Sequence, residues 1–134
     1  MFLVKDRKIE KESTPAVVDS TKIIMTQLLN RKEQEYYVLA TKSNKQGNSY
    51  VDTNYVEFYN NYINEYKQQE NALMFYYIDL DNALNKKYLS DELNITNTIE
   101  DLKINDEVLF KIKEGKIEKS YVGKEKILDK LSRL

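Results

Sequence analysis

The sequence predicts an α/β sandwich, built on a mixed central sheet that ends in a β-hairpin and a terminal helix. Two continuously apolar runs, typical of strands covered on both faces, flank a long segment with helical spacing. A strand, a turn with glycine and a returning strand follow, and an amphipathic segment closes the chain. Two parallel strands joined by a helix and followed by an antiparallel hairpin make a sandwich of this kind.

The C-terminal end, from Glu107 to Leu134, is the most readable part of the chain. The apolar residues of 108–112 predict a strand, Glu114-Gly115 a tight turn, and 117–122 the returning strand. Gly123 interrupts this pattern. The apolar residues that follow have helical spacing and predict a terminal helix: Ile127, Leu128, Leu131 and Leu134.

The two apolar runs, Tyr36 to Ala40 and Leu73 to Leu80, predict central strands. Between them, a helix is expected from Asp52 or Thr53 to about Gln69. Tyrosines spaced four, three and four residues apart form one stripe on this helix. We interpret the stripe as an apolar face packed on the sheet, in preference to a surface for stacking bases or sugars. Its members are Tyr55, Tyr59, Tyr62 and Tyr66.

Three further helical segments are expected. The first is capped by Asp19 or Ser20 and ends near Asn30, with Ile23, Ile24 and Leu28 on its apolar face. The second runs from Ala83 to Leu93, and the third is a single turn at 99–102. The core is expected to include nine residues: Leu39, Tyr59, Ile63, Phe75, Tyr77, Leu109, Phe110, Ile127 and Leu131.

Composition narrows the classes of function. The chain has 134 residues, a formal net charge of -1, and no cysteine or histidine. This length fits one folded domain, and the charge gives no reason to expect a nucleic-acid partner. Without cysteine there is no disulfide, thiolate metal site or thiol nucleophile, and without histidine no imidazole base or ligand. No cofactor is expected.

The N-terminal residues 1–15 are expected to form a loosely ordered arm, with the folded domain at 16–134. Phe2-Leu3-Val4 is too short to span a bilayer. Followed by the charged stretch Lys5 to Thr14, it also fits the stub of a removed membrane anchor and its tether. This second interpretation places the domain outside the cytoplasmic membrane of a bacterium, and the sequence leaves the choice open.

One acidic pair suggests an alternative enzyme function. Asp79 and Asp81 end the second central strand and could hold a divalent metal ion in a carboxylate-dependent enzyme. A bare Asp-x-Asp is common by chance, and turn chemistry at a strand end, together with Asn82, is the preferred interpretation.

The order of elements over most of Ser20 to Leu134 resembles thioredoxin-like proteins. Three segments carry the resemblance: Tyr-Tyr-Val-Leu-Ala at 36–40, Phe-Tyr-Tyr-Ile-Asp-Leu-Asp at 75–81, and the hairpin with its closing Gly123. The resemblance implies a three-layer sandwich. It also implies a Cys-x-x-Cys pair where the first strand meets the long helix and a cis-proline before the hairpin. Here the first place is the cysteine-free run Lys42 to Ser49, and Asn105 occupies the second.

The resemblance therefore implies a redox-inactive relative that acts as a binding or assembly module, with a membrane-linked bacterial complex as one setting. The expected partner is a protein or peptide, and the oligomeric state stays open. In this fold the loop after the first strand and the loop before the hairpin share one edge, which is the expected binding surface. It comprises Lys42, Ser43, Asn44, Lys45, Gln46, Tyr50, Ile104, Asn105 and Asp106.

Overall fold

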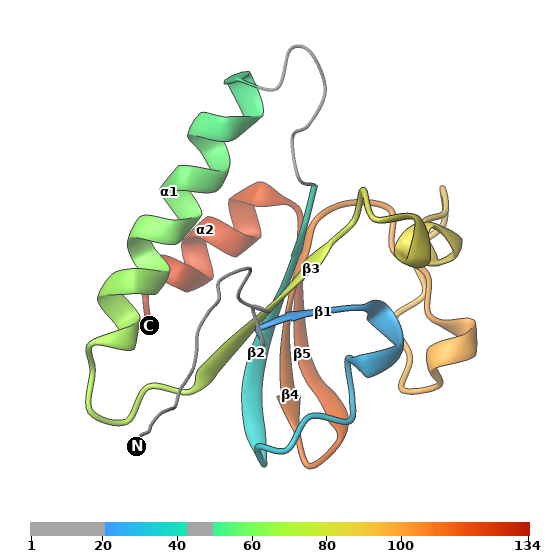
Figure 1. Cartoon of the computed structure of the whole chain (residues 1–134), viewed down its shortest axis with the longest axis horizontal. Helices are drawn as coiled ribbons and strands as arrows, with labels where there is room; N and C mark the ends of the chain where they lie inside the picture. Colours follow the sequence, from blue (N-terminus) through green and yellow to red (C-terminus); the bar gives the residue numbers. More distant parts are fainter. Residues whose placement is uncertain (1–20, 43–49) are drawn as a thin grey trace, which may run out of the picture.

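The computed structural model describes residues 21–42 and 50–134, with side chains described at 21–42 and from Tyr59 onward (Figure 1). The expected N-terminal arm, the caps Asp19 and Ser20, and the loop at 43–49 lie outside the described residues. So does the side chain of Tyr55.

A single five-stranded sheet runs through the described part of the chain, in the order β1-β3-β2-β4-β5 (Figure 1). Strands β1 and β2 are parallel to β3, whereas β4 is antiparallel to β2 and β5 is antiparallel to β4. The α/β class and the mixed sheet with its C-terminal hairpin are therefore confirmed. The strands are β1 (Lys22–Ile23), β2 (Glu35–Thr41), β3 (Met74–Asp79), β4 (Val108–Lys113) and β5 (Lys116–Val122).

Two α-helices cover one face of the sheet: α1 (Tyr50–Lys67) joins β2 to β3, and α2 (Lys124–Ser132) follows β5 (Figure 1). Both were expected, although α1 begins two residues before the earliest predicted start at Asp52. None of the helices in the described ranges is both long enough and apolar enough to cross a membrane. One buried cluster joins the helices to the sheet: Tyr37, Leu39, Tyr59, Ile63, Tyr66, Phe75, Leu109, Ile127 and Leu131.

The tyrosine stripe packs against the sheet as predicted, for the part that is described. The rings of Tyr59 and Tyr66 are buried and that of Tyr62 is half-buried. The Tyr66 hydroxyl accepts a 2.6 Å hydrogen bond from the N–H of Leu73, so its polar end is satisfied at the margin of the core. The rings of Tyr59, Tyr62 and Tyr66 are therefore part of the core or packed against it.

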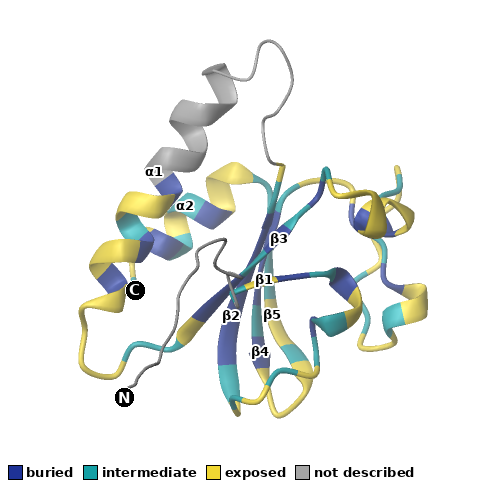
Figure 2. Cartoon of the chain, viewed as in Figure 1, coloured by how far each residue is buried: buried dark blue, intermediate teal, exposed yellow. Residues whose placement is uncertain are grey.

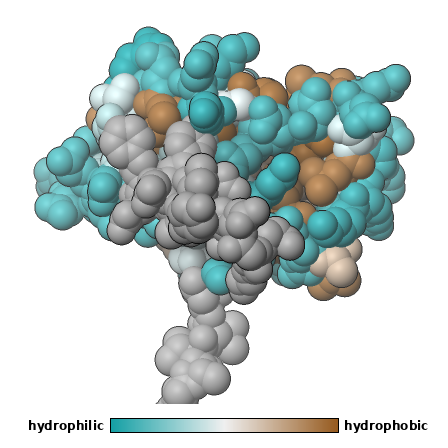
Figure 3. All heavy atoms as spheres, turned by 90° about the horizontal axis from the view of Figure 1, so that it is seen from above, coloured by the Kyte–Doolittle hydropathy of each residue, from teal (hydrophilic) through white to brown (hydrophobic). Residues whose placement is uncertain are grey.

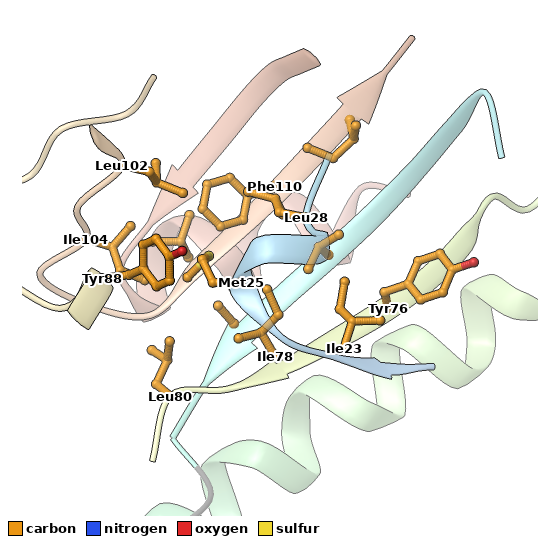
Figure 4. Close-up of a cluster of buried hydrophobic side chains, with 14 of the residues drawn as sticks. Ile23, Met25, Leu28, Tyr76, Ile78, Leu80, Tyr88, Leu102, Ile104 and Phe110 are labelled. Carbon is orange, nitrogen blue, oxygen red and sulfur yellow. The ribbon is translucent and has the colours of Figure 1, made fainter. Parts of the chain in front are cut away.

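The opposite face is covered by short 3₁₀ helices and the segments around them (Figures 1 and 4). These helices are Met25–Gln27, Ala83–Tyr88 and Ile99–Asp101. They and their neighbours bury Met25, Leu28, Tyr88, Leu102 and Ile104 against β2, β3 and β4. The single turn at 99–102 is confirmed. The helix expected over 83–93 is present only as a 3₁₀ helix at Ala83–Tyr88, and the helix expected up to Asn30 is wrong, since that segment forms β1 and a 3₁₀ helix of three residues.

Long-range hydrogen bonds explain why the segment expected to be helical up to Asn30 is not α-helical. The C=O of Thr21 accepts the N–H of Tyr77, which aligns β1 with β3, and Ile23 lies opposite Ile78. The Met25 N–H then donates to the side chain of Asn85, 60 residues away. These partners replace the local bonds that an α-helix needs.

Burial is highest in the middle strands and falls toward β5 (Figure 2). Eight of the nine expected core residues are buried, and the ninth, Tyr77, is half-buried while its neighbour Tyr76 is buried. In a strand covered on both faces, alternation cannot show which side chain lies at the margin. The Lys67 ammonium lies 5.6 Å from the Tyr77 ring, at the exposed end of α1.

The hairpin turn has the expected chemistry. Glu114 and Gly115 have φ angles of 54° and 75°, the left-handed conformation that a two-residue hairpin turn requires. The Glu114 N–H donates a 2.8 Å hydrogen bond to the C=O of Gln34, which holds the turn against the start of β2.

Candidate functional site

The candidate site lies where β2 ends, α1 passes and the chain enters β4, at the upper end of the sheet in Figure 1. One carboxylate joins all three elements. Glu107 accepts a 3.2 Å hydrogen bond from the backbone N–H of Lys42 through Oε2. Through Oε1 it accepts a 3.1 Å hydrogen bond from the hydroxyl of Tyr59 on α1. Glu107 therefore sets the spacing between the two loops expected to share this edge.

Burial shapes the electrostatics of Glu107. Desolvation raises the pKa of this half-buried carboxyl above its ordinary value, and the neighbouring carboxylate of Asp106 adds to the rise. The hydrogen bonds from Lys42 and Tyr59 stabilise the charged form and partly oppose this effect. The result is a carboxylate that is held in place and more easily protonated than an exposed one.

The loop before β4 has residues both on the surface and in the core. Asn105 and Asp106 are exposed, as a binding surface requires, and the Asp106 carboxylate accepts a 2.7 Å hydrogen bond from the Glu107 N–H. Ile104 is fully buried, and its backbone bonds to Tyr88 and Ser90. Its apolar side chain completes the core beneath the 3₁₀ helices, so Ile104 is not available to a partner and is removed from the expected surface.

Asn105 is exposed, and its hydrogen-bonding groups have no partner among the described residues. Within the described ranges, no hydrogen bond involves its backbone or its side-chain amide. The described backbone contains no cis peptide bond, so this position does not reproduce the cis-proline of active thioredoxin-like proteins.

Of the other expected surface residues, Lys42 is exposed. The remaining ones lie outside the described side chains: Ser43, Asn44, Lys45, Gln46 and Tyr50.

Asp79 and Asp81 take part in turn chemistry at the end of β3. The Asp79 carboxylate accepts a 2.9 Å hydrogen bond from the Asp81 N–H, and the Asp81 carboxylate lies 3.9 Å from the Lys86 ammonium. The next residue, Asn82, accepts the Leu84 N–H and caps the following 3₁₀ helix. Among the described residues, no three side chains of acidic, cysteine or histidine type form a group suited to a metal ion. The metal-dependent enzyme stays an untested alternative.

Sequence reasoning did not single out Glu107. It looks like an ordinary charged residue ahead of an apolar strand. Its role depends on Lys42 and Tyr59, which are 65 and 48 residues away in the chain. Only its position next to the predicted start of a strand could have drawn attention to it.

Comparisons with protein-family models, curated proteins and solved structures yield no match for this chain.

Proposed function

We propose that this chain is a redox-inactive, thioredoxin-like module that binds an extended segment of a partner protein. The binding site is the edge of the sheet where Glu107 links the end of β2 to the loop before β4. The arrangement of the sheet supports the thioredoxin-like part of the proposal. A helix connects the parallel strands β2 and β3, an antiparallel hairpin follows, and both α-helices cover the same face. This is the element order on which the sequence resemblance depends.

The contact between the two loops is the observation that carries the binding role. The bond from Lys42 to Glu107 brings the end of β2 within hydrogen-bonding distance of the loop before β4. Beside it, Asn105 presents backbone and amide groups that have no partner among the described residues. Extended peptides bind folded domains through such backbone groups, with side-chain contacts adding specificity. Binding of this kind needs no sulfur.

A peptide-selection experiment tests the proposal. Random linear peptides are selected against the wild-type chain, and the affinity of selected peptides is measured by fluorescence polarisation. A triple variant then replaces Asn44, Gln46 and Asn105 with alanine. We expect it to bind at least about tenfold more weakly, since it removes several polar contacts worth about 1 kcal/mol each. Its thermal midpoint should match that of the wild type.

The matched control changes the same residue types on another surface. Asn61, Asn64 and Gln68 are exposed on or just after α1, and their alanine triple variant should bind peptides normally. If selection yields no binding peptide, or if both triple variants bind equally well, the edge is not the binding site and the proposal fails.

A further inference from the structure

A pocket of about 600 Å³ opens beside β3, on the side of β2 away from β4. Its walls come from β1 and the residues after it, from the carboxyl ends of β2 and β3, and from α1. Its size falls within the range of about 300 to 1,000 Å³ that is usual for small-molecule sites. In open α/β sheets, ligands bind outside the carboxyl ends of the strands.

The lining combines an apolar wall with a positively charged rim. Ile24, Leu39 and Tyr77 contribute apolar surface, while the exposed Lys22 and Lys42 bring ammonium groups. Hydrophobic and hydrophilic side chains meet at the surface on this end of the molecule (Figure 3).

Among the described residues of the lining, one carboxylate, that of Asp79, also faces the pocket, and it already accepts the Asp81 N–H. Lys22 and Lys42 outnumber it, so the described part of the lining has a net charge of +1.

We propose that this pocket binds a small organic anion with an apolar body. The apolar part would lie against Leu39 and Tyr77, and the acidic group would interact with Lys22 and Lys42. Such a molecule loses water from its apolar surface while its charge stays near the solvent, where a lysine can meet it without a large desolvation cost. The site goes beyond the peptide-binding edge, which it adjoins at Lys42; the rest of its lining comes from β1 and the residues after it, β2, β3 and the residues after it, and α1.

Two fluorescent probes that share an apolar body test the charge requirement. 8-Anilinonaphthalene-1-sulfonate carries a sulfonate, and N-phenyl-1-naphthylamine does not. We expect saturable binding of the sulfonate probe to the native chain with one site per molecule. The variant Lys22→Gln should weaken the sulfonate probe about two- to fivefold, as expected for one exposed charge pair, and leave the neutral probe unchanged. Lys119→Gln, at an exposed position of β5, is the control and should change neither probe.

A steric pair of variants tests the location. Asn60 and Asn61 are adjacent exposed residues of α1, but only Asn60 lines the pocket. The variant Asn60→Trp should weaken both probes at least about tenfold, because the larger side chain on the pocket wall takes up volume that the probe needs. Asn61→Trp should bind both probes like the wild type. Circular dichroism confirms that each variant is folded.

Chemical-shift mapping on the wild-type chain makes the outcome independent of the variants. Adding the sulfonate probe should shift the methyl resonances of Ile23 and Ile24, which line the pocket, and not those of Ile117 on β5. Shifts confined to other residues overturn the proposal. Equal effects of the two tryptophan variants, or sulfonate binding that is indifferent to Lys22→Gln, overturn it as well.

Discussion

The hydroxyl of Tyr59 donates a 3.1 Å hydrogen bond to the carboxylate of Glu107, which ties the middle of α1 to the loop before β4. The Tyr59 ring is fully buried in the cluster beneath the helices, so its position is fixed by packing. Glu107 in turn holds the Lys42 N–H at the end of β2. One side chain from each of two distant segments thus determines the shape of the proposed binding edge.

Replacing Tyr59 by phenylalanine tests this link. The ring and its packing remain, but Glu107 loses one donor while it stays half-buried. We expect the free energy of unfolding to fall by about 1.5 to 3 kcal/mol, the usual range for a hydrogen bond to a charged group. Urea unfolding at neutral pH measures it. Tyr121→Phe is the control: Tyr121 is half-buried and lies beside Lys130, so its change should stay within about 0.5 kcal/mol. Equal losses would contradict the link.

The raised pKa of Glu107 predicts a pH dependence of definite sign. Between the ordinary pKa of 4.5 and the higher folded value, the folded chain binds more protons than the unfolded chain. The contribution of Glu107 to stability is therefore greatest at low pH. It falls as the pH rises through this window and is constant above the folded pKa.

Comparison with Glu107→Gln isolates this effect. The free energy of unfolding of the wild type minus that of the variant should decrease as the pH rises above about 4.5 and then level off. Subtracting the two free energies removes the contributions of other groups, which are the same in both proteins. One of these is Glu118, whose pKa is lowered by Lys111 and whose contribution therefore changes with pH in the opposite direction. A difference that stays constant or increases over this range would show that burial does not control Glu107.

The elements that the sequence predicted well are those whose secondary structure follows from the pattern of apolar residues within the element itself. Strands β2 and β3 are continuous apolar runs, and α1 and α2 carry apolar residues at helical spacing. The hairpin turn needs positive φ, which Gly115 provides without strain. Each of these signals is local, so no knowledge of distant partners was needed.

The predictions that failed concern residues whose structure or role depends on distant parts of the chain. Ile23, Ile24 and Leu28 have spacing that fits a helix, yet the chain there pairs with β3 and bonds to Asn85. The same holds for Glu107, whose partners come from β2 and α1. Contacts between residues far apart in the sequence overrode helix propensity in the first case and gave Glu107 its role in the second. A single sequence carries no record of such contacts.

Asn85 offers a direct test of one such contact. It is 1% exposed, accepts the Met25 N–H at 2.8 Å and donates to the Asp79 C=O at 2.8 Å. Asn85→Ala leaves both backbone groups without this partner. We expect a loss of about 1 to 3 kcal/mol in the free energy of unfolding, the usual cost of one buried group without a partner, because the Asp79 C=O keeps its bond from the Asn82 N–H and the Met25 N–H has no such replacement. Asn64→Ala, an exposed position of α1, should be neutral or slightly stabilising. A neutral Asn85→Ala would contradict the proposed role.

The central core predicts a larger effect at Phe110. This side chain is fully buried on β4, within the cluster covered by the 3₁₀ helices (Figure 4). Phe110→Ala removes a ring that no neighbour can replace, so we expect a loss of about 3 to 5 kcal/mol. Leu84→Ala, at a position that is 64% exposed, should cost less than about 0.5 kcal/mol. Chemical denaturation of both variants measures the contrast, and similar losses would exclude Phe110 from the core.

The last prediction concerns redox chemistry. The chain has no cysteine, so we expect it not to catalyse the reduction of insulin disulfides by dithiothreitol. A single cysteine, as in Asn44→Cys, should not create a catalyst. One thiolate can attack a disulfide, but a second thiol is needed to resolve the mixed disulfide that forms.

A series of variants tests which added part creates activity. The pair Asn44→Cys and Gly47→Cys introduces a Cys-x-x-Cys spacing, and Asn105→Pro then adds a proline at the position before the hairpin. We expect no activity from the single variant, weak activity from the pair, and the highest activity with the proline, since a cis bond is far less costly before proline than before asparagine. Insulin turbidity measures all three. Activity in the single variant equal to that of the pair would contradict this, because the mixed disulfide would then be resolved by dithiothreitol as fast as by a second cysteine of the chain.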